Sequence, residues 1–273
     1  MLYLCATPIG NMEDITLRVL RVLSEVDAVY AEDTRHSAQL LSHYDIKKPL
    51  LSCHEHNEAE RSEQIAERLK NGENIAYISD AGMPCISDPG ARLISVCIEK
   101  GLEFTVLPGA SASVTALALS GLNTDKFLFY GFLPRTGKER REALLSAASS
   151  EVTVILYESP NRVGDTLREL CEYAGEDRRA ALVREITKVF EEARRGTLRE
   201  LCELYREASP KGECVIVLEG KPHESAKSED VDDFLRNCLA TGMRAKDAAK
   251  LASESLGVAK NEAYKRVLEL MQD

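Results

Sequence analysis

The feature that most constrains this chain is a pattern that recurs along its first half: an apolar stretch, a polar turn, and a segment with helical spacing. The stretches are short and rich in β-branched residues, as in strands that are buried on both faces. Because a helix separates each stretch from the next, the connections are crossovers and the sheet is largely parallel. The pattern predicts an α/β fold with first strands at 2–6, 28–31, 50–53, 75–78 and 104–107.

The turn after residues 75–78 holds two Ser-Asp pairs together with Gly82, Gly90, Pro84 and Pro89. The glycines permit a positive φ and a close approach of the backbone, and the prolines stiffen the same loop. Open α/β sheets bind their ligands at the carboxyl ends of strands. An ordinary strand-to-helix turn would need neither this length nor two aspartates. Residues 79–90 are therefore predicted to form a ligand-binding loop.

Two further parts follow the first sheet. An apolar segment at 127–132 and strands at 153–157, 180–183 and 214–218 indicate a second α/β unit. Residues 220–230 are polar and predict a linker, and apolar stripes of helical spacing beyond it predict a small helical module. A packing module and a helix-turn-helix are both compatible with these stripes. The predicted domains are 1–124 and 125–222, both α/β, and the helical module 230–273.

Composition narrows the class of protein. The 273 residues carry a formal net charge of −10, which argues against a broad surface that coats nucleic acid but leaves room for a local basic patch. No apolar run approaches the ~18 residues of a membrane span, and the start is too short for the apolar region of a signal peptide. The eight cysteines are scattered without a C-x-x-C spacing, so a reducing, cytoplasmic location is expected.

The turns at the strand ends lack the known phosphate-binding motifs. Neither G-x-G-x-x-G nor G-x-x-x-x-G-K-[ST] occurs, which argues against the dinucleotide-binding and P-loop NTPase classes. Backbone groups with a carboxylate suit a small zwitterionic ligand with an adenine better than a triphosphate. His54 and His56 are spaced for one face of an extended chain, but no third and fourth ligand follows at a fixed spacing, so no metal is expected.

Three turns place opposite charges side by side, at 32–36, 158–162 and 184–188. As solvated ion pairs, these side chains would contribute little to stability. If the turns converge on a cleft, their arginines and lysine would instead hold phosphates, and the spacing leaves both interpretations open. The cluster of Arg135, Lys138, Arg140 and Arg141 is likewise either a rim that binds RNA or a solvated linker face.

Taken together, the turns resemble those of the tetrapyrrole-methylase superfamily, most closely its branch that methylates a cytidine 2′-oxygen in small-subunit ribosomal RNA. The matching stretches follow in order over about residues 1–220, and such a series is more specific than a single motif. Two departures are small: Met83 to Cys85 replaces a smaller run such as Thr-Pro-Gly, and Asn161 stands where histidine is usual. The stretches are ATPIGNMEDITLR, AEDTRHS, HEHNE, SDAGMPCISDPG, PGASAS, SGL with GFLPR, YESPNR and REITKVFEE.

The resemblance implies two α/β domains of the tetrapyrrole-methylase type with S-adenosylmethionine in the cleft between them. The cofactor would contact the first turn, the 79–90 loop and the small-residue turn after 104–107. Two strand ends and the 211–212 turn of the second domain would complete the pocket. By position, the implied cofactor-binding residues are Pro8, Ile9, Asp80, Gly82, Met83, Ser111, Ala112, Leu156, Val183, Lys211 and Gly212.

The implied reaction transfers the methyl group of the sulfonium to a ribose oxygen of a decoding-centre cytidine in 16S rRNA. A free hydroxyl is a weak nucleophile, so a base has to take its proton. The candidate bases are Glu185 and Lys188, with His54 and Asp33 behind them, and the sequence does not decide among these four. The candidate substrate-binding residues are Arg35, Arg162, Arg135 and Arg140.

The resemblance also implies the small ribosomal subunit as a partner and a homodimer as the assembly. Two other functions stay open. One is a tetrapyrrole or cobalamin-precursor C-methyltransferase on the same fold, and the other is a non-catalytic RNA- or nucleotide-binding protein that kept the cleft. Methyl transfer to corrinoid precursors but not to rRNA would favour the first, and tight cofactor binding without turnover would favour the second.

Overall fold

The computed structural model describes residues 1–222 and 228–271 in two compact units, Met1–Gly220 and Lys221–Asp273. Each unit has a hydrophobic core of its own and is described by itself. No helix in the two described ranges combines the length and the apolar character needed to cross a lipid bilayer.

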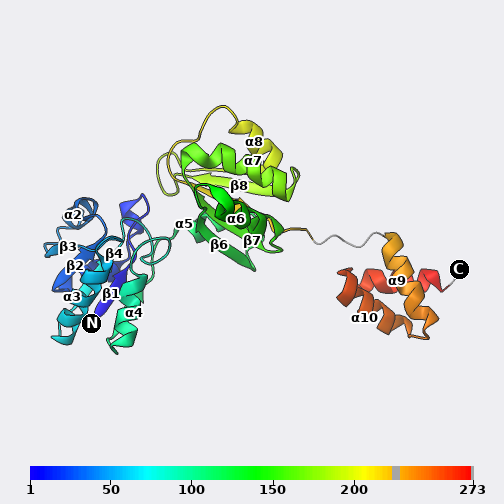
Figure 1. The fold of residues 1–273 in the computed structure, drawn as a ribbon, viewed down its shortest axis with the longest axis horizontal. Helices are drawn as coiled ribbons and strands as arrows, with labels where there is room; N and C mark the ends of the chain where they lie inside the picture. The colour runs from blue at the N-terminus through cyan, green and yellow to red at the C-terminus, as the bar shows by residue number, and fades with distance from the viewer. Residues whose placement is uncertain (223–227, 272–273) are drawn as a thin grey trace. The chain divides into compact units, whose positions relative to one another are not determined.

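The first sheet of the large unit is parallel throughout, as the crossover pattern predicts (Figure 1). Its strands are β1 (Leu2–Cys5), β2 (Ala28–Ala31), β3 (Leu50–Ser52), β4 (Ile75–Ile78) and β5 (Phe104–Leu107). Their order in the sheet is β3-β2-β4-β1-β5. Strand β4 is buried along its whole length, which fits a continuous apolar run better than an alternating one.

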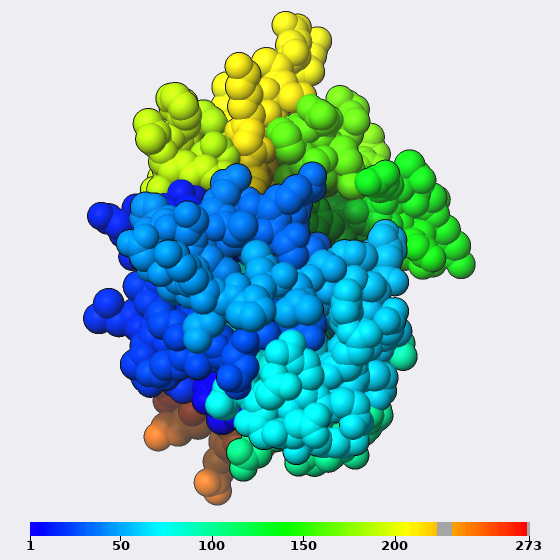
Figure 2. Space-filling model, turned by 90° about the vertical axis from the view of Figure 1, so that its left-hand side faces the viewer, coloured from blue at the N-terminus to red at the C-terminus, as the bar shows by residue number. Residues whose placement is uncertain are grey.

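Helices cover both faces of this sheet. The short 3-10 helix η1 (Met12–Asp14) precedes α1 (Leu17–Glu25), and α1 packs with α2 (Thr34–His43) on one face. On the other face lie α3 (Glu58–Lys70) and α4 (Ala91–Glu99). Figure 2 views the unit from the side of α2 and α3, whose residues are blue to cyan. Because both faces are covered, the carboxyl edge of the sheet is the place where a ligand can reach the strands.

The second sheet is mixed. Its strands are β6 (Phe127–Phe132), β7 (Thr153–Glu158), β8 (Arg179–Arg184), β9 (Glu192–Thr197) and β10 (Cys214–Leu218), in the order β6-β7-β10-β8-β9. Strands β6 and β7 are parallel, whereas β10 is antiparallel to both of its neighbours and β9 is antiparallel to β8. The sequence analysis did not identify β9 because its residues, EARRGT, are mostly polar, as an edge strand allows.

Helices also cover both faces of the second sheet. One face carries α6 (Gly137–Ser149), α7 (Val163–Ala174), which follows the short 3-10 helix η2 (Pro160–Arg162), and α8 (Leu198–Leu204). The other face carries α5 (Ala112–Ser120), which contacts β7, β8, β9 and β10. Since α5 precedes residue 124, the proposed bounds 1–124 and 125–222 separate this helix from the sheet that it covers.

Turns from the two sheets lie against each other. Thr7 and Gly82 exchange backbone hydrogen bonds of 2.9 and 3.0 Å, which joins the turn after β1 to the loop after β4. The backbone N–H of Asn11 donates to Thr187 Oγ1 at 3.1 Å, which joins the same turn to residues 185–188 of the second sheet. A Cβ atom on Gly10 would overlap the side chain of Lys188, so the two turns are in close contact.

The small unit is a three-helix module made of α9 (Ser228–Ala240), α10 (Ala245–Leu256) and α11 (Lys260–Leu270). Its apolar stripes meet in a core that includes Leu235, Ala249 and Val267, which confirms the predicted helical character. Of the predicted linker at 220–230, residues 223–227 lie outside the described residues, as do 272–273 at the end of the predicted module.

The core of the module predicts a local effect of one substitution. Leu235 is fully buried, and Leu235→Ala removes about 2–5 kcal/mol from a module whose small core has little stability in reserve. We expect amide hydrogen exchange, followed by mass spectrometry, to accelerate throughout 228–271 and to stay unchanged in 1–220. The control Leu268→Ala, at a position that is 42% exposed, should leave both regions as in the wild type. Equal acceleration in 1–220 would contradict the independence of the module.

Candidate functional site

A cavity of about 370 Å³ lies where the ends of strands from both sheets meet, a volume within the usual range of ligand pockets. The turn after β1, the loop after β4, the start of α5 and the ends of β6 and β7 contribute to its wall, together with the start of β10. Most of its lining residues are apolar or small. No lysine or arginine lines it in the part of the chain that the structure describes. Its polar lining residues are Ser87, Asp88, Ser111, Glu158, Ser159 and Glu213.

A smaller hollow of about 170 Å³ adjoins the cavity and shares Ile9, Ala81 and Glu213 with it. Lys188 and His36 line this hollow from the second sheet and from α2, respectively. The carboxyl edges of the two sheets thus enclose two adjoining spaces, one mainly apolar and one that includes a cationic side chain.

The structure divides the residues predicted to bind the cofactor among three places. Pro8 and Asp80 line the smaller hollow, whereas Lys211, Leu156 and Val183 line neither space. The members that line the larger cavity are Ile9, Gly82, Met83, Ser111, Ala112 and Gly212.

Strand geometry explains why Leu156 and Val183 are not in the lining. Leu156 is fully buried in the core beneath α6 and α7, and because side chains alternate along a strand, its neighbour Tyr157 lines the cavity instead. Val183 is fully buried in the core beneath α5. Both side chains contribute to packing, and Tyr157, next to the predicted Leu156, is the residue of β7 that lines the cavity at this point.

The loop at 79–90 has a constrained backbone. Gly82 and Gly90 have φ values of +79° and +124°, as the sequence analysis expected of the two glycines. Cys85 and Ser87 also have positive φ values, 70° and 62°, which are uncommon for residues with a side chain. Hydrogen bonds hold this conformation: Cys85 N–H donates to the carbonyl oxygen of Pro89 at 3.2 Å, and Gly90 N–H donates to Glu58 Oε1 at 2.9 Å.

Glu185 and Lys188, the first two candidate bases, form an ion pair. Lys188 Nζ lies 2.9 Å from Glu185 Oε1 and 3.1 Å from Glu213 Oε2. The hydrogen bond from Lys188 lowers the pKa of Glu185. Burial opposes the charged form of Lys188, but the hydrogen bonds to the two glutamates outweigh it and raise the pKa of Lys188. Lys188 is therefore protonated near neutral pH and cannot accept a proton, and its lowered pKa makes the Glu185 carboxylate a weaker base.

The other two candidate bases, Asp33 and His54, line neither the cavity nor the hollow. Hydrogen bonds from the side chain and the backbone of Arg35 lower the pKa of Asp33 well below its usual range. The backbone N–H of Asp33 donates to Asp80 Oδ1 at 3.0 Å, which connects Asp33 to the loop after β4. His54 Nδ1 is buried and has no hydrogen-bond partner within the described residues.

Sequence reasoning missed Asp88, the aspartate of the second Ser-Asp pair in the loop. It is partly buried and lines the larger cavity. Burial, followed by the negative charges of Glu32 and Asp80, raises the pKa of Asp88 to about 6. The signal was present in the sequence, because both pairs were noted, but only Asp80 was assigned a role.

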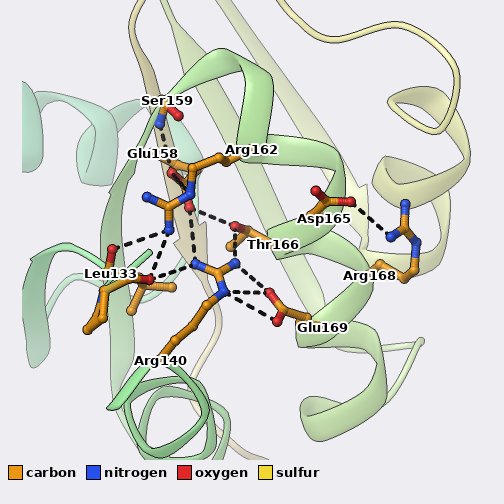
Figure 3. A network of polar contacts seen from close by, with 10 residues as sticks. Leu133, Arg140, Glu158, Ser159, Arg162, Asp165, Thr166, Arg168 and Glu169 are labelled. Atoms are coloured by element: carbon orange, nitrogen blue, oxygen red, sulfur yellow. Dashed lines mark hydrogen bonds and ion pairs between the residues drawn. The ribbon is translucent and has the colours of Figure 1, made fainter. Parts of the chain in front are cut away.

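Two of the predicted substrate-binding arginines have internal roles (Figure 3). Arg140 is buried and donates from Nε to Glu169 Oε2 at 2.9 Å and from Nη2 to Thr166 Oγ1 at 2.8 Å. Arg162 donates to the carbonyl oxygens of residues 133 and 134, and its Nε lies 3.4 Å from Glu158 Oε1. The expectation that these two side chains hold substrate is corrected, since each is already paired with a partner inside the protein.

The other two predicted substrate-binding arginines are exposed. Arg35 has a side-chain exposure of 89% and pairs with Asp33 at 2.7 Å. Arg135 is exposed and lines a groove together with Arg141 and Arg168. Exposed guanidinium groups of this kind are available to phosphate oxygens.

Within residues 1–222 and 228–271, no group of three or more His, Cys, Asp or Glu side chains is arranged to hold a metal ion. The rings of His54 and His56 lie 6.0 Å apart. The expectation that the protein holds no metal stays a prediction.

Comparison with known proteins adds a family context. Residues 1–202 match the family described as Tetrapyrrole (Corrin/Porphyrin) Methylases, and residues 225–271 match the RsmI C-terminal HTH domain. The Ribosomal RNA small subunit methyltransferase I of Haemophilus influenzae is 44% identical over 97% of this chain and 95% of its own length. The protein of the same name from Halalkalibacterium halodurans is 44% identical over 96% of this chain and 93% of its own length.

A solved structure shares the fold at lower identity. Uroporphyrin-III C-methyltransferase from Thermus thermophilus, in complex with S-adenosylhomocysteine, superposes with a TM-score of 0.58 and 18% identity. The match covers 80% of this chain and 96% of that one. It supports the two-sheet architecture described above.

The internal role of Arg140 predicts a large loss of stability in one variant. Arg140→Ala leaves Glu169 without its cation and removes the more buried of the two arginines beside Glu158, and we expect the free energy of unfolding to fall by about 3–5 kcal/mol. Arg135→Ala, at an exposed neighbouring position, should change it by less than about 0.5 kcal/mol. Urea unfolding followed by circular dichroism measures both. An Arg140→Ala protein as stable as the control would show that the network contributes nothing.

The raised pKa of Asp88 predicts how stability depends on pH. The folded state binds the Asp88 proton more tightly than the unfolded state does, so the contribution of this group is favourable below pH about 4 and is lost as the pH rises through about 6. Asp88→Asn removes this dependence. The stability of the variant relative to the wild type, measured by urea unfolding, should therefore rise between pH about 4 and about 7.5. Solvent screening at this partly exposed site keeps the rise below the ~3 kcal/mol that the full shift would give. An equal difference between the two proteins at both pH values would contradict the prediction.

Proposed function

The chain belongs to the tetrapyrrole methylase family, and from this premise we propose that it transfers a methyl group from S-adenosylmethionine to small-subunit ribosomal RNA. The full-length similarity to proteins named Ribosomal RNA small subunit methyltransferase I supports the RNA substrate. The match of residues 225–271 to the RsmI C-terminal HTH domain also supports it. The tetrapyrrole-modifying neighbour, by contrast, aligns with only 80% of this chain.

The observation that carries the proposal is the chemistry of the larger cavity. Its apolar and small residues suit an adenine and a thioether chain, while Asp88 and Glu213 bring carboxylates to a wall without lysine or arginine. A sulfonium with an amino group is cationic and fits such a wall, whereas a triphosphate does not. When bound there, S-adenosylmethionine supplies an activated methyl group. The residues proposed to hold it are Ile9, Gly82, Met83, Ser111, Ala112 and Gly212.

We propose the 2′-oxygen of a decoding-centre cytidine in 16S rRNA as the acceptor. Proteins that recognise RNA by sequence usually bind unpaired nucleotides, whose bases are splayed out and stacked on aromatic or apolar side chains. Phe132 and Ile86 line the cavity and are 58% and 46% exposed, so they are available to such a base. The exposed Arg35 and Arg135 are the proposed phosphate contacts, and they allow local binding by a chain with a net charge of −10.

The proposal extends to the setting of the reaction. A substrate in the small ribosomal subunit places the protein in the cytoplasm, and the resemblance to the family supports a homodimer. Light scattering at several protein concentrations would test the assembly, since a stable dimer keeps twice the mass of the 30.2 kDa chain on dilution.

Methyl transfer to isolated particles tests the proposed function. S-adenosylmethionine labelled in the methyl group is incubated with the protein and with small-subunit particles from a strain that lacks this activity. We expect label in one cytidine of 16S rRNA, at a linkage that resists alkaline hydrolysis because its 2′-oxygen is blocked. Particles that already carry the modification are the matched control and should take up no label.

Two outcomes would replace the proposal. Label in corrinoid or porphyrin precursors but not in rRNA would identify a tetrapyrrole C-methyltransferase, the activity named for the structural neighbour. Tight binding of S-adenosylmethionine without transfer to either acceptor would identify a binding protein that kept the cleft.

A further inference from the structure

Asp88 is held in a fixed position at the wall of the larger cavity. It lies between Ser87, whose φ of 62° is in the left-handed region, and Pro89, whose carbonyl oxygen accepts the N–H of Cys85 at 3.2 Å. A Cβ atom on Gly90 would overlap Cys85 Sγ and Tyr77, so the loop is also closely packed. A backbone constrained on both sides of Asp88 holds this residue at the wall of the cavity.

The surroundings of Asp88 differ from those of the four bases considered from sequence. Glu185, Lys188 and Asp33 are each paired with an opposite charge, and neither Asp33 nor His54 lines the cavity. Asp88 has no ion-pair partner within the described residues. The negative charges of Glu32 and Asp80 raise the pKa of Asp88, and the charge of Asp88 in turn raises the pKa of Cys85 and of Tyr157. None of these four side chains carries a positive charge.

The side of the cavity that holds Asp88 also faces the exposed rim. Ile86, two residues before Asp88, and Phe132 at the end of β6 both line the cavity and are about half exposed. A Cβ atom on Gly131, next to Phe132, would overlap Ser87 Oγ, so the loop and the end of β6 are in contact there. Arg135 follows three residues after Phe132. A nucleotide whose base stacks on Phe132 would lie at the rim of the cavity that Asp88 also lines.

We propose that Asp88 is the general base that accepts the proton of the ribose 2′-hydroxyl during methyl transfer. The assignment rests on the proposed function. It replaces Glu185, Lys188, His54 and Asp33 in that role, and it leaves the Glu185–Lys188 pair as part of the junction between the two sheets.

The step balances without a further reactant. The Asp88 carboxylate takes the hydroxyl proton as the ribose oxygen forms a bond to the methyl carbon. The carbon–sulfur bond breaks, and its electron pair passes to sulfur, which leaves a neutral thioether. A carboxylate of ordinary pKa would be a weaker base for this step, and the raised pKa of Asp88, about 6, makes it a better acceptor that is still ionised near neutral pH.

The test compares Asp88→Asn with the wild type on small-subunit particles, and Asp177→Asn, at a surface position with 91% side-chain exposure, is the control. We expect Asp88→Asn to lower kcat about 10²–10⁴-fold, the usual effect of removing a general base. Its Kd for S-adenosylhomocysteine, by calorimetry, should stay within about threefold of the wild type, which also shows that the variant is folded. Asp177→Asn should keep the wild-type kcat.

The pH dependence of the wild type gives an independent readout. As the pH is lowered, the rate should fall with a midpoint at or below about 6, because the protonated carboxyl group of Asp88 cannot accept a proton. The midpoint can lie below about 6 because the positive charge of the bound sulfonium lowers the pKa of Asp88. A wild-type rate that is flat between about pH 4.5 and about 7 would overturn the assignment even if Asp88→Asn failed to fold.

The remaining outcomes separate this assignment from the proposed function. An Asp88→Asn variant with normal kcat but weakened binding of S-adenosylmethionine relative to S-adenosylhomocysteine would make Asp88 a counter-charge to the sulfonium and overturn its role as base. Normal kcat with normal binding would overturn any role at the site. A wild-type protein that labels no rRNA would overturn the proposed function and the assignment together.

Discussion

The contact between two turns, one from each sheet, is the interaction on which the rest of the large unit depends. The Asn11 N–H donates to Thr187 Oγ1, and the backbone at Gly10 packs against Lys188. Without this contact, the carboxyl edge of the first sheet and the corresponding edge of the second would not share a cavity. The positive φ values of Glu185 and Thr187, 51° and 66°, show that the second turn adopts an uncommon backbone to meet the first.

The charged residues near the cavity differ in role according to the groups that surround them. Lys188 lies between Glu185 and Glu213, where its charge is neutralised. At the end of β7, Glu158 accepts hydrogen bonds from Ser159 N–H at 2.9 Å and from Thr166 Oγ1 at 2.6 Å, beside Arg162. Both clusters hold loops in place, and their charges are satisfied internally. Asp88 differs because the groups near it are acidic, and a carboxylate in such surroundings is better placed to bind a proton.

Much of the fold could be predicted from the sequence, since long-range pairing of apolar stretches follows from their periodicity. The first sheet is parallel as expected, and the module after residue 228 is helical. The mixed order of the second sheet could not be read, because β10, the last strand along the chain, lies between β7 and β8 and is antiparallel to both. In addition, nothing in the composition of the polar edge strand β9 marks it as a strand. The attachment of α5 to the second sheet also depends on tertiary packing, since a helix with apolar residues on all sides fits either sheet.

The sequence predicts which segments surround the candidate site better than it predicts which side chains point into it. Gly82, Met83 and Ser111 belong to turns whose place in the fold follows from the strand pattern, and they line the cavity. Leu156 does not, because the direction of a side chain reverses at each residue of a strand and the sequence does not fix that register. Arg140 illustrates a different limit: a basic cluster in the sequence does not reveal which of its members is buried by a later glutamate.

Gly212 lies in the turn before β10 with a φ of +86°, and a Cβ atom there would overlap the carboxyl group of Glu185. The two positions therefore constrain each other's evolution: a lineage that acquires a side chain at 212 has to shorten or redirect the one at 185. Comparison of divergent relatives should then show the two positions changing as a pair, with glutamate retained only where glycine is retained.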